Sequence, residues 1–453
     1  MIGEVFNMDA ASKELEEKVL DKIKGRVSLS QSSGEKESAL LSAFQEFCVS
    51  TGELESECEK KYFSDAATRE EFFREFYSFG AIENLLNDPN VEDIIINGIS
   101  KVYIHHAKEG FKEVGKLFTS IEEVNLLVKK ILVFSGKKVL KKINNVDLPG
   151  MRGRANIVYS PFGPELTITK IKSKPLSIID LIKSKTLNAE MAALLWLYVE
   201  GLGSRPANIL ISGGPGCGKT TLMNALLSFI PEDQHIVVIE DVLELVIDWI
   251  GNVSRLESDE DLSLADLVKN SLRMRPERIL VGEVRGEEAQ DMVTAMNIGK
   301  YCIATIHAST VNEAILRLES NPMNVEPPLL KLIDVIIVMG KSKEHEHPYR
   351  FIGELSETAG LEQKVVLISS LWKFNLASET FDELLPTSVY RDRLSQASGI
   401  SGKGILEEIT KRREFLNLLA RNNISSLKEV SHYCGIYIHD KTLAMREVEN
   451  YHG

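Results

Sequence analysis

Short apolar runs rich in β-branched residues recur through the middle of the chain, and segments with apolar residues at helical spacing lie between some of them. Each run has the length and composition of a buried strand. The predicted strands are 208–212, 235–239, 279–282, 301–306 and 334–339, and the predicted helices are 189–200, 221–227, 263–274 and 287–296. Strands that are continuously apolar and alternate with helices are typical of a mostly parallel sheet covered on both faces. The pattern therefore predicts an α/β domain.

A smaller α/β unit is predicted upstream of this domain. Two strands flank an Asn97-Gly98 turn, an amphipathic helix follows, and a second strand pair closes the unit. These elements are expected at 91–96, 101–105, 121–134, 154–159 and 166–171.

Helices are expected at both ends of the chain. The N-terminal ones are predicted at 11–24, 38–49 and 67–86, and the C-terminal ones at 405–422 and 426–433, after a hairpin of 350–355 with 365–374. The third helix carries one aromatic stripe, for which packing onto the next domain is favoured over a partner site. Its members are Phe72, Phe73, Phe76 and Phe79.

These patterns divide the chain into five parts. The fold class is α/β, with an N-terminal helical extension, a small α/β domain, a linker, a central α/β domain and a helical C-terminal region. The expected limits are 1–80, 81–172, 173–186, 187–375 and 376–453.

Composition places the chain among soluble globular proteins, with 43% hydrophobic and 26% charged residues over 453 positions. The five cysteines form no C-x-x-C pair, which argues against a disulfide framework or a cysteine-based zinc site and favours a cytoplasmic setting. No secretory signal and no apolar stretch of membrane-spanning length is found, so any membrane contact is expected through a partner only.

Net charge is −13, but acidic residues prevail in 1–80 and basic residues in 101–185. This asymmetry fits either surfaces with different partners or two solvated faces. A basic cluster within it is interpreted as a solvated or partner-facing patch, with no nucleic acid expected, because the chain is acidic and few aromatics interleave it. The cluster comprises Lys129, Lys130, Lys137, Lys138, Lys141 and Lys142.

A glycine-rich loop lies between the strand at 208–212 and the helix that follows it. Such a loop lets backbone N–H groups cradle anionic oxygens at a helix N-terminus, so it predicts the binding of ATP. Lys219 would reach the β- and γ-phosphates and Thr220 would take Mg²⁺. The predicted nucleotide-binding residues are Gly213, Gly214, Pro215, Gly216, Cys217, Gly218, Lys219, Thr220 and Thr221, with Arg154 of the upstream unit as a further candidate.

Hydrolysis also needs groups that hold the metal and orient water. Glu283 ends an apolar strand and is the candidate for activating the attacking water, with Arg285 neutralising charge. Glu240 and Asp241 end another strand and could hold the hydrated Mg²⁺ or polarise water. His307, after a further strand, could sense or stabilise the γ-phosphate.

With these segments in order, the chain resembles the secretion-superfamily or traffic ATPases of type II secretion, type IV pili, tight-adherence pili, the archaellum and type IV secretion. The resemblance covers roughly 85–339, and the tail at 407–437 is similar to the archaeal branch. Four boxes carry the resemblance: 213–220 (Walker A), 239–244 (aspartate box), 278–286 with the preceding 271–277 (Walker B region) and 305–308 (histidine box).

The resemblance implies a PAS-like N-terminal domain, a RecA-like P-loop domain and a homohexameric ring. ATP would bind between the two lobes, and hydrolysis would act on a polytopic membrane platform protein from the inner face of the cytoplasmic membrane. The family's Thr-Ile-Arg-Lys strand reads Thr167-Ile168-Thr169-Lys170 here, which removes one arginine contact, and its Gly-His-x-Gly segment reads Gly299-Lys300-Tyr301-Cys302. The tetracysteine zinc module of the bacterial relatives is absent from the sequence.

Four functions remain open at this point. The leading hypothesis is a motor ATPase for a type IV pilus-like filament, an archaellum or type II-like secretion. The others are a type IV secretion (conjugation-type) ATPase, a nucleotide-binding scaffold with little turnover, and a RecA-like nucleic-acid ATPase, against which the acidic balance argues.

Overall fold

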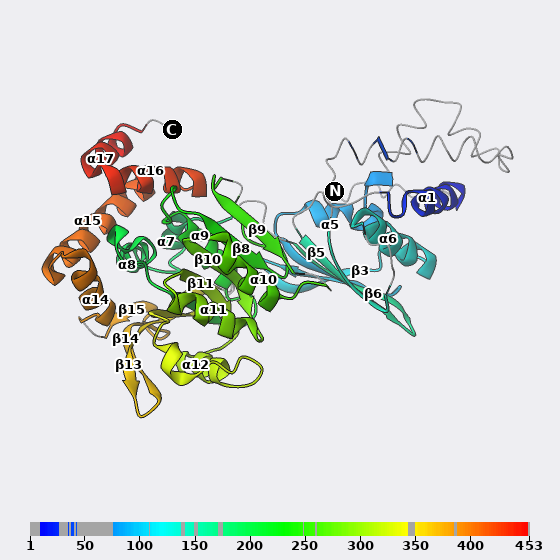
Figure 1. Cartoon of the computed structure of the whole chain (residues 1–453). Coiled ribbons are helices and arrows are strands. Elements are labelled where there is room, and N and C mark those ends of the chain that lie inside the picture. Colours follow the sequence, from blue (N-terminus) through cyan, green and yellow to red (C-terminus); the bar gives the residue numbers. More distant parts are fainter. Residues whose placement is uncertain are drawn as a thin grey trace. The chain divides into compact units, whose positions relative to one another are not determined.

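The computed structural model describes residues 10–26, 35, 38–39, 42, 76–107, 109–136, 141–148, 153–170, 175–247, 249–258, 261–342, 349–384 and 387–451. The chain divides into two compact units, Met1–Ser173 and Lys174–Gly453 (Figure 1). Each unit has its own hydrophobic core. The predicted α/β fold class is confirmed in both.

The first unit is built on a six-stranded sheet in the order β3-β2-β1-β6-β5-β4. All of its neighbouring strands pair antiparallel. The strands are β1 (Val91–Asn97), β2 (Val102–His106), β3 (Gly110–Gly115), β4 (Ile143–Asp147), β5 (Gly153–Ser160) and β6 (Gly163–Lys170). Helix α6 (Ile121–Phe134) begins at a Ser120 cap and packs Val124, Val128 and Ile131 into the core of this unit.

The N-terminal helices of the sequence are only partly within the described residues. Helix α1 (Ala10–Ile23) matches the first predicted helix, whereas 38–49 lies almost wholly outside the described residues. The prediction of a continuous helix over 67–86 is wrong for the residues that the structure describes, because the chain bends at Ser78 and Gly80 takes a φ of +57°. A short 3₁₀ turn (Gly80–Ile82) and helix α5 (Glu83–Asn87) follow instead.

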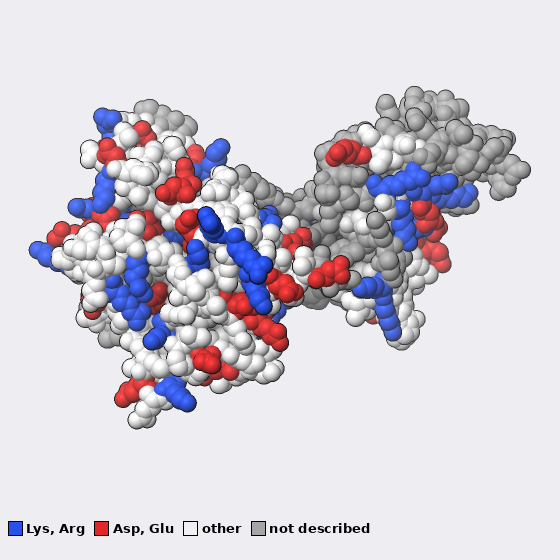
Figure 2. Space-filling model, viewed as in Figure 1, with Lys and Arg blue, Asp and Glu red and all other residues white. Residues whose placement is uncertain are grey.

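Helix α1 lies against α6 and neutralises part of the predicted basic cluster. Lys129 pairs with Glu17 at 3.2 Å and Asp21 at 2.8 Å, and the buried Lys130 pairs with Glu16. Basic and acidic side chains lie side by side on the visible surface of this region (Figure 2). Lys137 and Lys138 lie outside the described residues.

The second unit contains a nine-stranded sheet in the order β15-β14-β13-β12-β7-β11-β10-β8-β9. The strands from β12 to β9 are parallel, and β13 to β15 add an antiparallel edge. The parallel strands are β7 (Ile209–Gly213), β8 (Ile236–Glu240), β9 (Val253–Glu257), β10 (Arg278–Val284), β11 (Tyr301–Ile306) and β12 (Val335–Lys341). The antiparallel strands are β13 (Arg350–Glu362), β14 (Val365–Asn375) and β15 (Thr380–Glu383).

Helices cover both faces of this sheet, as the apolar strands predict. Ile209 and Ile211 of β7 face one core, and Leu210 between them faces the other. The first core includes α7 (Ile178–Lys183), α8 (Ala189–Glu200), α9 (Lys219–Leu227), α14 (Val389–Ser398), α15 (Gly402–Arg421), α16 (Leu427–His439) and α17 (Lys441–Glu449). The second includes α10 (Leu264–Ser271), α11 (Glu288–Asn297), α12 (Val311–Glu319) and α13 (Pro327–Leu330).

The parallel arrangement places the carboxyl ends of β7, β8, β10 and β11 along one edge of the sheet. Ligands of open α/β sheets bind at this edge. The last residues of these four strands, together with the segments that follow them, carry all of the predicted site residues of the second unit. Across the described residues, no helix is both long and apolar enough to cross a membrane.

Candidate functional site

The loop between β7 and α9 adopts the conformation that its glycines predict. Gly213 has a φ of +151°, and a Cβ there would lie 2.4 Å from Cys217 Sγ and 2.8 Å from the Met339 carbonyl oxygen. Gly218 has a φ of +97° and caps α9, which begins at Lys219. Both positions therefore require glycine on steric grounds.

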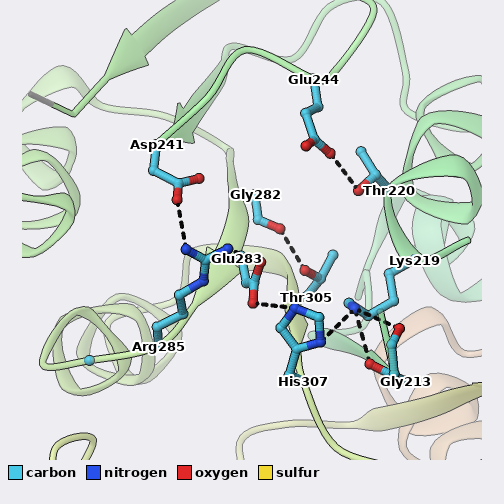
Figure 3. A network of polar contacts seen from close by, with 12 residues as sticks. Gly213, Lys219, Thr220, Asp241, Glu244, Gly282, Glu283, Arg285, Thr305 and His307 are labelled. Atoms are coloured by element: carbon cyan, nitrogen blue, oxygen red, sulfur yellow. Dashed lines mark hydrogen bonds and ion pairs between the residues drawn. The ribbon is translucent and has the colours of Figure 1, made fainter. Parts of the chain in front are cut away.

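Lys219 lies inside this loop rather than extending away from it. Its Nζ donates to the carbonyl oxygens of Gly213 at 3.0 Å and Gly214 at 3.2 Å, and lies 3.1 Å from His307 Nδ1 (Figure 3). Burial lowers the pKa of Lys219, and the charges of Glu283 and Glu244 act against that shift. A phosphate between the loop and Lys219 would supply the anionic partner that the ammonium group lacks among these carbonyls.

Thr220 is held by an acid other than the two that the sequence nominated. Its Oγ1 donates to Glu244 Oε2 at 3.0 Å. Glu240 is 1% exposed, and its carboxylate accepts from the backbone N–H groups of Glu244 and Leu245, both at 2.8 Å, and from Arg255 Nη2 at 3.0 Å. Burial raises the pKa of Glu240, and Arg255 and the two N–H groups oppose the rise. Glu240 thus shapes the loop that presents Glu244.

A chain of two ion pairs links Asp241 through Arg285 to Glu283. Arg285 reaches Glu283 Oε2 at 2.5 Å with one nitrogen and Asp241 Oδ2 at 3.1 Å with another. The buried Glu288 fixes the turn that carries Arg285, because its Oε1 accepts from the backbone N–H groups of Arg285 and Gly286 at 2.5 and 2.7 Å.

Glu283 also faces His307, whose Nε2 lies 2.9 Å from Glu283 Oε1. Burial alone would raise the pKa of Glu283, but the hydrogen bond and charge of Arg285, with His307 and Lys219, hold it below its ordinary value. Burial and the charge of Lys219 lower the pKa of His307, although the charge of Glu283 acts to raise it. At neutral pH the pair is therefore a carboxylate facing a neutral imidazole.

A hollow of about 690 Å³ opens beside this pair. Its lining includes Gly214, Pro215, Glu283 and His307. It also includes Arg285, Arg317 and other residues of α12 and of the turn after it. The hollow therefore connects the end of the phosphate-binding loop with the surface of α12.

The structure brings together the predicted loop residues, Asp241, Glu283, Arg285 and His307 within the second unit (Figure 3). Arg154 belongs to β5 of the first unit, so its contact with nucleotide stays a prediction. Lys170 donates to the carbonyl oxygens of Leu85 and Asp88 within that unit.

Sequence reasoning missed Glu244, Arg255 and Glu288. Glu244 lies in the same acidic segment as Glu240, four positions on, and this spacing was the available signal.

The arrangement can bind a phosphate chain and a hard cation. Backbone N–H groups at the start of α9 and Lys219 suit anionic oxygens. Thr220 and Glu244 offer the hydroxyl and carboxylate oxygens that Mg²⁺ prefers, whereas Asp241 pairs with Arg285. Within the part of the chain that the structure describes, no group of three or more His, Cys, Asp or Glu side chains could hold a metal alone. The Thr220–Glu244 pair fits Mg²⁺, which keeps several waters and is bound by one or two carboxylates and substrate phosphates.

Comparison with known proteins identifies a family and several relatives of this chain. Residues 141–340 match the family described as "Type II/IV secretion system protein". The chain is 39% identical over 233 residues to the uncharacterized protein MJ0781 of Methanocaldococcus jannaschii, a match that covers 49% of this chain but only 32% of that protein. MJ1287 of the same organism is 32% identical over 263 residues, covering 56% of this chain and 96% of that protein. The probable conjugal transfer protein TrbB of Sinorhizobium fredii is 32% identical over 241 residues, covering 52% and 72%.

Proposed function

The chain belongs to the type II/IV secretion system protein family, and from this premise we propose that it is an ATPase whose hydrolysis cycle drives secretion or filament assembly. The observation that carries the proposal is the meeting of Lys219, Glu283 and His307 at one edge of the sheet, beside a glycine loop at a helix N-terminus. This set combines an anion cradle with a half-buried carboxylate that stays ionised.

Each side chain has a role that follows from its position. Lys219 leaves the Gly213 and Gly214 carbonyls and pairs with the β- and γ-phosphates. Thr220 and Glu244 would hold Mg²⁺, which neutralises charge on the phosphates when it is bound. Glu283 orients the attacking water and accepts its proton, because its depressed pKa keeps it ionised at neutral pH. Arg285 and the neutral His307 fix this carboxylate from two sides.

The wider function is a cytoplasmic homohexamer that acts on a polytopic membrane platform protein of a pilus-like or type II-like system. Two compact units on either side of Ser173 support this proposal, since a motor needs parts that can move against each other. Membrane contact would come through the platform protein only. The predicted division into five parts remains a proposal at its finer boundaries.

A type IV secretion ATPase is the second candidate. The similarity to TrbB, a probable conjugal transfer protein, favours it specifically. A nucleotide-binding scaffold with little turnover is the third, and measured turnover separates it from both motors.

The test compares the wild type with Lys219→Ala in ATP binding and steady-state hydrolysis. Loss of the charged partner of the phosphates is expected to weaken ATP binding by about tenfold to a hundredfold and to abolish turnover. Lys269→Ala, an exposed change on α10, is the matched control and is expected to keep both. Wild-type protein that binds no ATP, or Lys219→Ala protein that turns over normally, would refute the proposal.

A further inference from the structure

The loop that carries His307 is held at two successive carbonyl groups. It connects β11, which ends at Ile306, with the Thr310 cap of α12. Ser212 of β7 donates from its Oγ to the Ala308 carbonyl oxygen at 2.6 Å. Arg317, near the end of α12, donates from its Nη1 to the His307 carbonyl oxygen.

The second of these contacts acts directly on the residue that faces Glu283. The imidazole of His307 lies between Lys219 and Glu283. One ring nitrogen is within hydrogen-bonding distance of Lys219, and the other is within hydrogen-bonding distance of Glu283. A rotation of the His307 backbone would move both ring nitrogens at once. Fixing its carbonyl oxygen therefore restrains the backbone from which the ring extends, while Lys219 and Glu283 contact the ring itself.

The position and chemistry of Arg317 suit it to restrain the His307 backbone. Leu318 beside it is fully buried, as is Ala314 one turn earlier, so the helix backbone that carries the arginine is anchored in the core. The guanidinium group is planar and donates in fixed directions, which a lysine ammonium cannot reproduce. Arg317 also lines the hollow that Glu283, Arg285 and His307 share.

We propose that Arg317 is a positioning residue that couples α12 to the His307–Glu283 pair. Through the His307 carbonyl it holds the imidazole in the orientation that supports the water-activating carboxylate. The expected effect on kcat rests on the proposed ATPase function, whereas the expected effect on the His307 ring does not require nucleotide. Movement of α12, which borders the hollow, would then alter hydrolysis without touching the phosphate-binding loop.

The experiment uses the full chain with Arg317→Met and Arg317→Lys, and Asn312→Ala as an exposed control on the same helix. For Arg317→Met we expect kcat to fall by about tenfold, less than the roughly hundredfold that a 1 Å misplacement can cost, with KM for ATP unchanged. Arg317→Lys should recover part of this loss. On a His307→Ala background, Arg317→Met should cost nothing further, because its effect passes through the imidazole.

Histidine-ring NMR of nucleotide-free protein provides the independent readout. The His307 ring signals should move in Arg317→Met and stay in place in Asn312→Ala. Unmoved ring signals, or a loss of kcat that multiplies with that of His307→Ala, would overturn the inference. If the wild type hydrolyses no ATP, the proposed function fails, and the NMR result still decides the role of Arg317.

Discussion

The acidic residues near the phosphate-binding loop differ in what each of them contacts. Glu244 contacts the Thr220 hydroxyl, Glu283 contacts Arg285 and His307, and Glu240 is enclosed by Arg255 and backbone N–H groups. The proposed roles in metal binding and water activation, and the role in loop structure, therefore fall on three different carboxylates, although all three lie at or just after the ends of apolar strands.

Substitution of Glu244 and of Glu240 should separate metal binding from loop structure. Glu244→Gln is expected to raise the Mg²⁺ concentration needed for hydrolysis by about tenfold or more, because a carboxylate ligand is lost. Glu240→Gln should instead lower the free energy of unfolding by about 1–3 kcal/mol, since it weakens buried bonds to Arg255 and the loop. Mg²⁺ titration of activity and urea denaturation measure the two effects. The reverse pattern would restore the sequence-based metal role of Glu240.

Removal of Arg285 should change the pH dependence of hydrolysis. Arg285 opposes the effect of burial on Glu283, so in Arg285→Met the pKa of Glu283 rises. The carboxylate then becomes protonated at higher pH, and the acid limb of the kcat/KM profile moves to higher pH. Arg285→Lys keeps the charge and should leave the limb closer to the wild-type position. A limb that stays in place or moves to lower pH in Arg285→Met would count against Glu283 as the base.

At the scale of elements, the C-terminal helices are joined to the nucleotide-binding domain by a buried ionic network. Arg412 of α15 reaches Glu200 at the end of α8 at 2.7 Å and Glu408 at 3.1 Å, and its guanidinium lies 4.7 Å from the ring centre of Trp196. Lys441 of α17 completes the network at Glu408. The tail is therefore part of the same folded unit as the phosphate-binding loop.

Arg412→Leu should destabilise this unit strongly. It leaves the buried Glu200 without its counter-charge, although Glu408 keeps Lys441, and breaking a buried pair in this way typically costs about 3–5 kcal/mol. The adjacent Arg413→Leu, at a more exposed arginine 3.6 Å from Glu190, should cost less than about 1 kcal/mol. All three tryptophans lie after residue 174, so their fluorescence during urea denaturation reports on this unit alone. Equal losses in the two variants would contradict the argument.

Elements with a strong pattern could be predicted from sequence, whereas weakly patterned ones could not. Helix α8 matches its prediction because it is apolar from Met191 to Val199 and is capped by Gly201, which adopts φ +65°. Strand β3 is largely exposed and β9 only half-buried, so neither shows an apolar run. The omission of β9 had a consequence for the site, since this strand supplies Arg255, the partner that encloses Glu240. Loop residues such as Glu244 depend on tertiary folding that periodicity does not encode.

At the scale of the whole molecule, the proposed function couples a chemical site in the second unit to movement between two compact units. The phosphate-binding loop, Glu283 and His307 all belong to the second unit, so the bond-breaking chemistry can be tested without reference to ring assembly. Arg154 belongs to the first unit, so its contact with nucleotide stays a prediction.

Turnover of Glu283→Gln protein is the most direct test of this account, with Glu287→Gln as the control at an exposed neighbouring glutamate. The account predicts that Glu283→Gln binds ATP about as tightly as the wild type but loses hydrolysis by about a hundredfold or more, because no carboxylate accepts the proton of the attacking water. Glu287→Gln should hydrolyse ATP normally. Hydrolysis by Glu283→Gln at the wild-type rate would contradict the central claim.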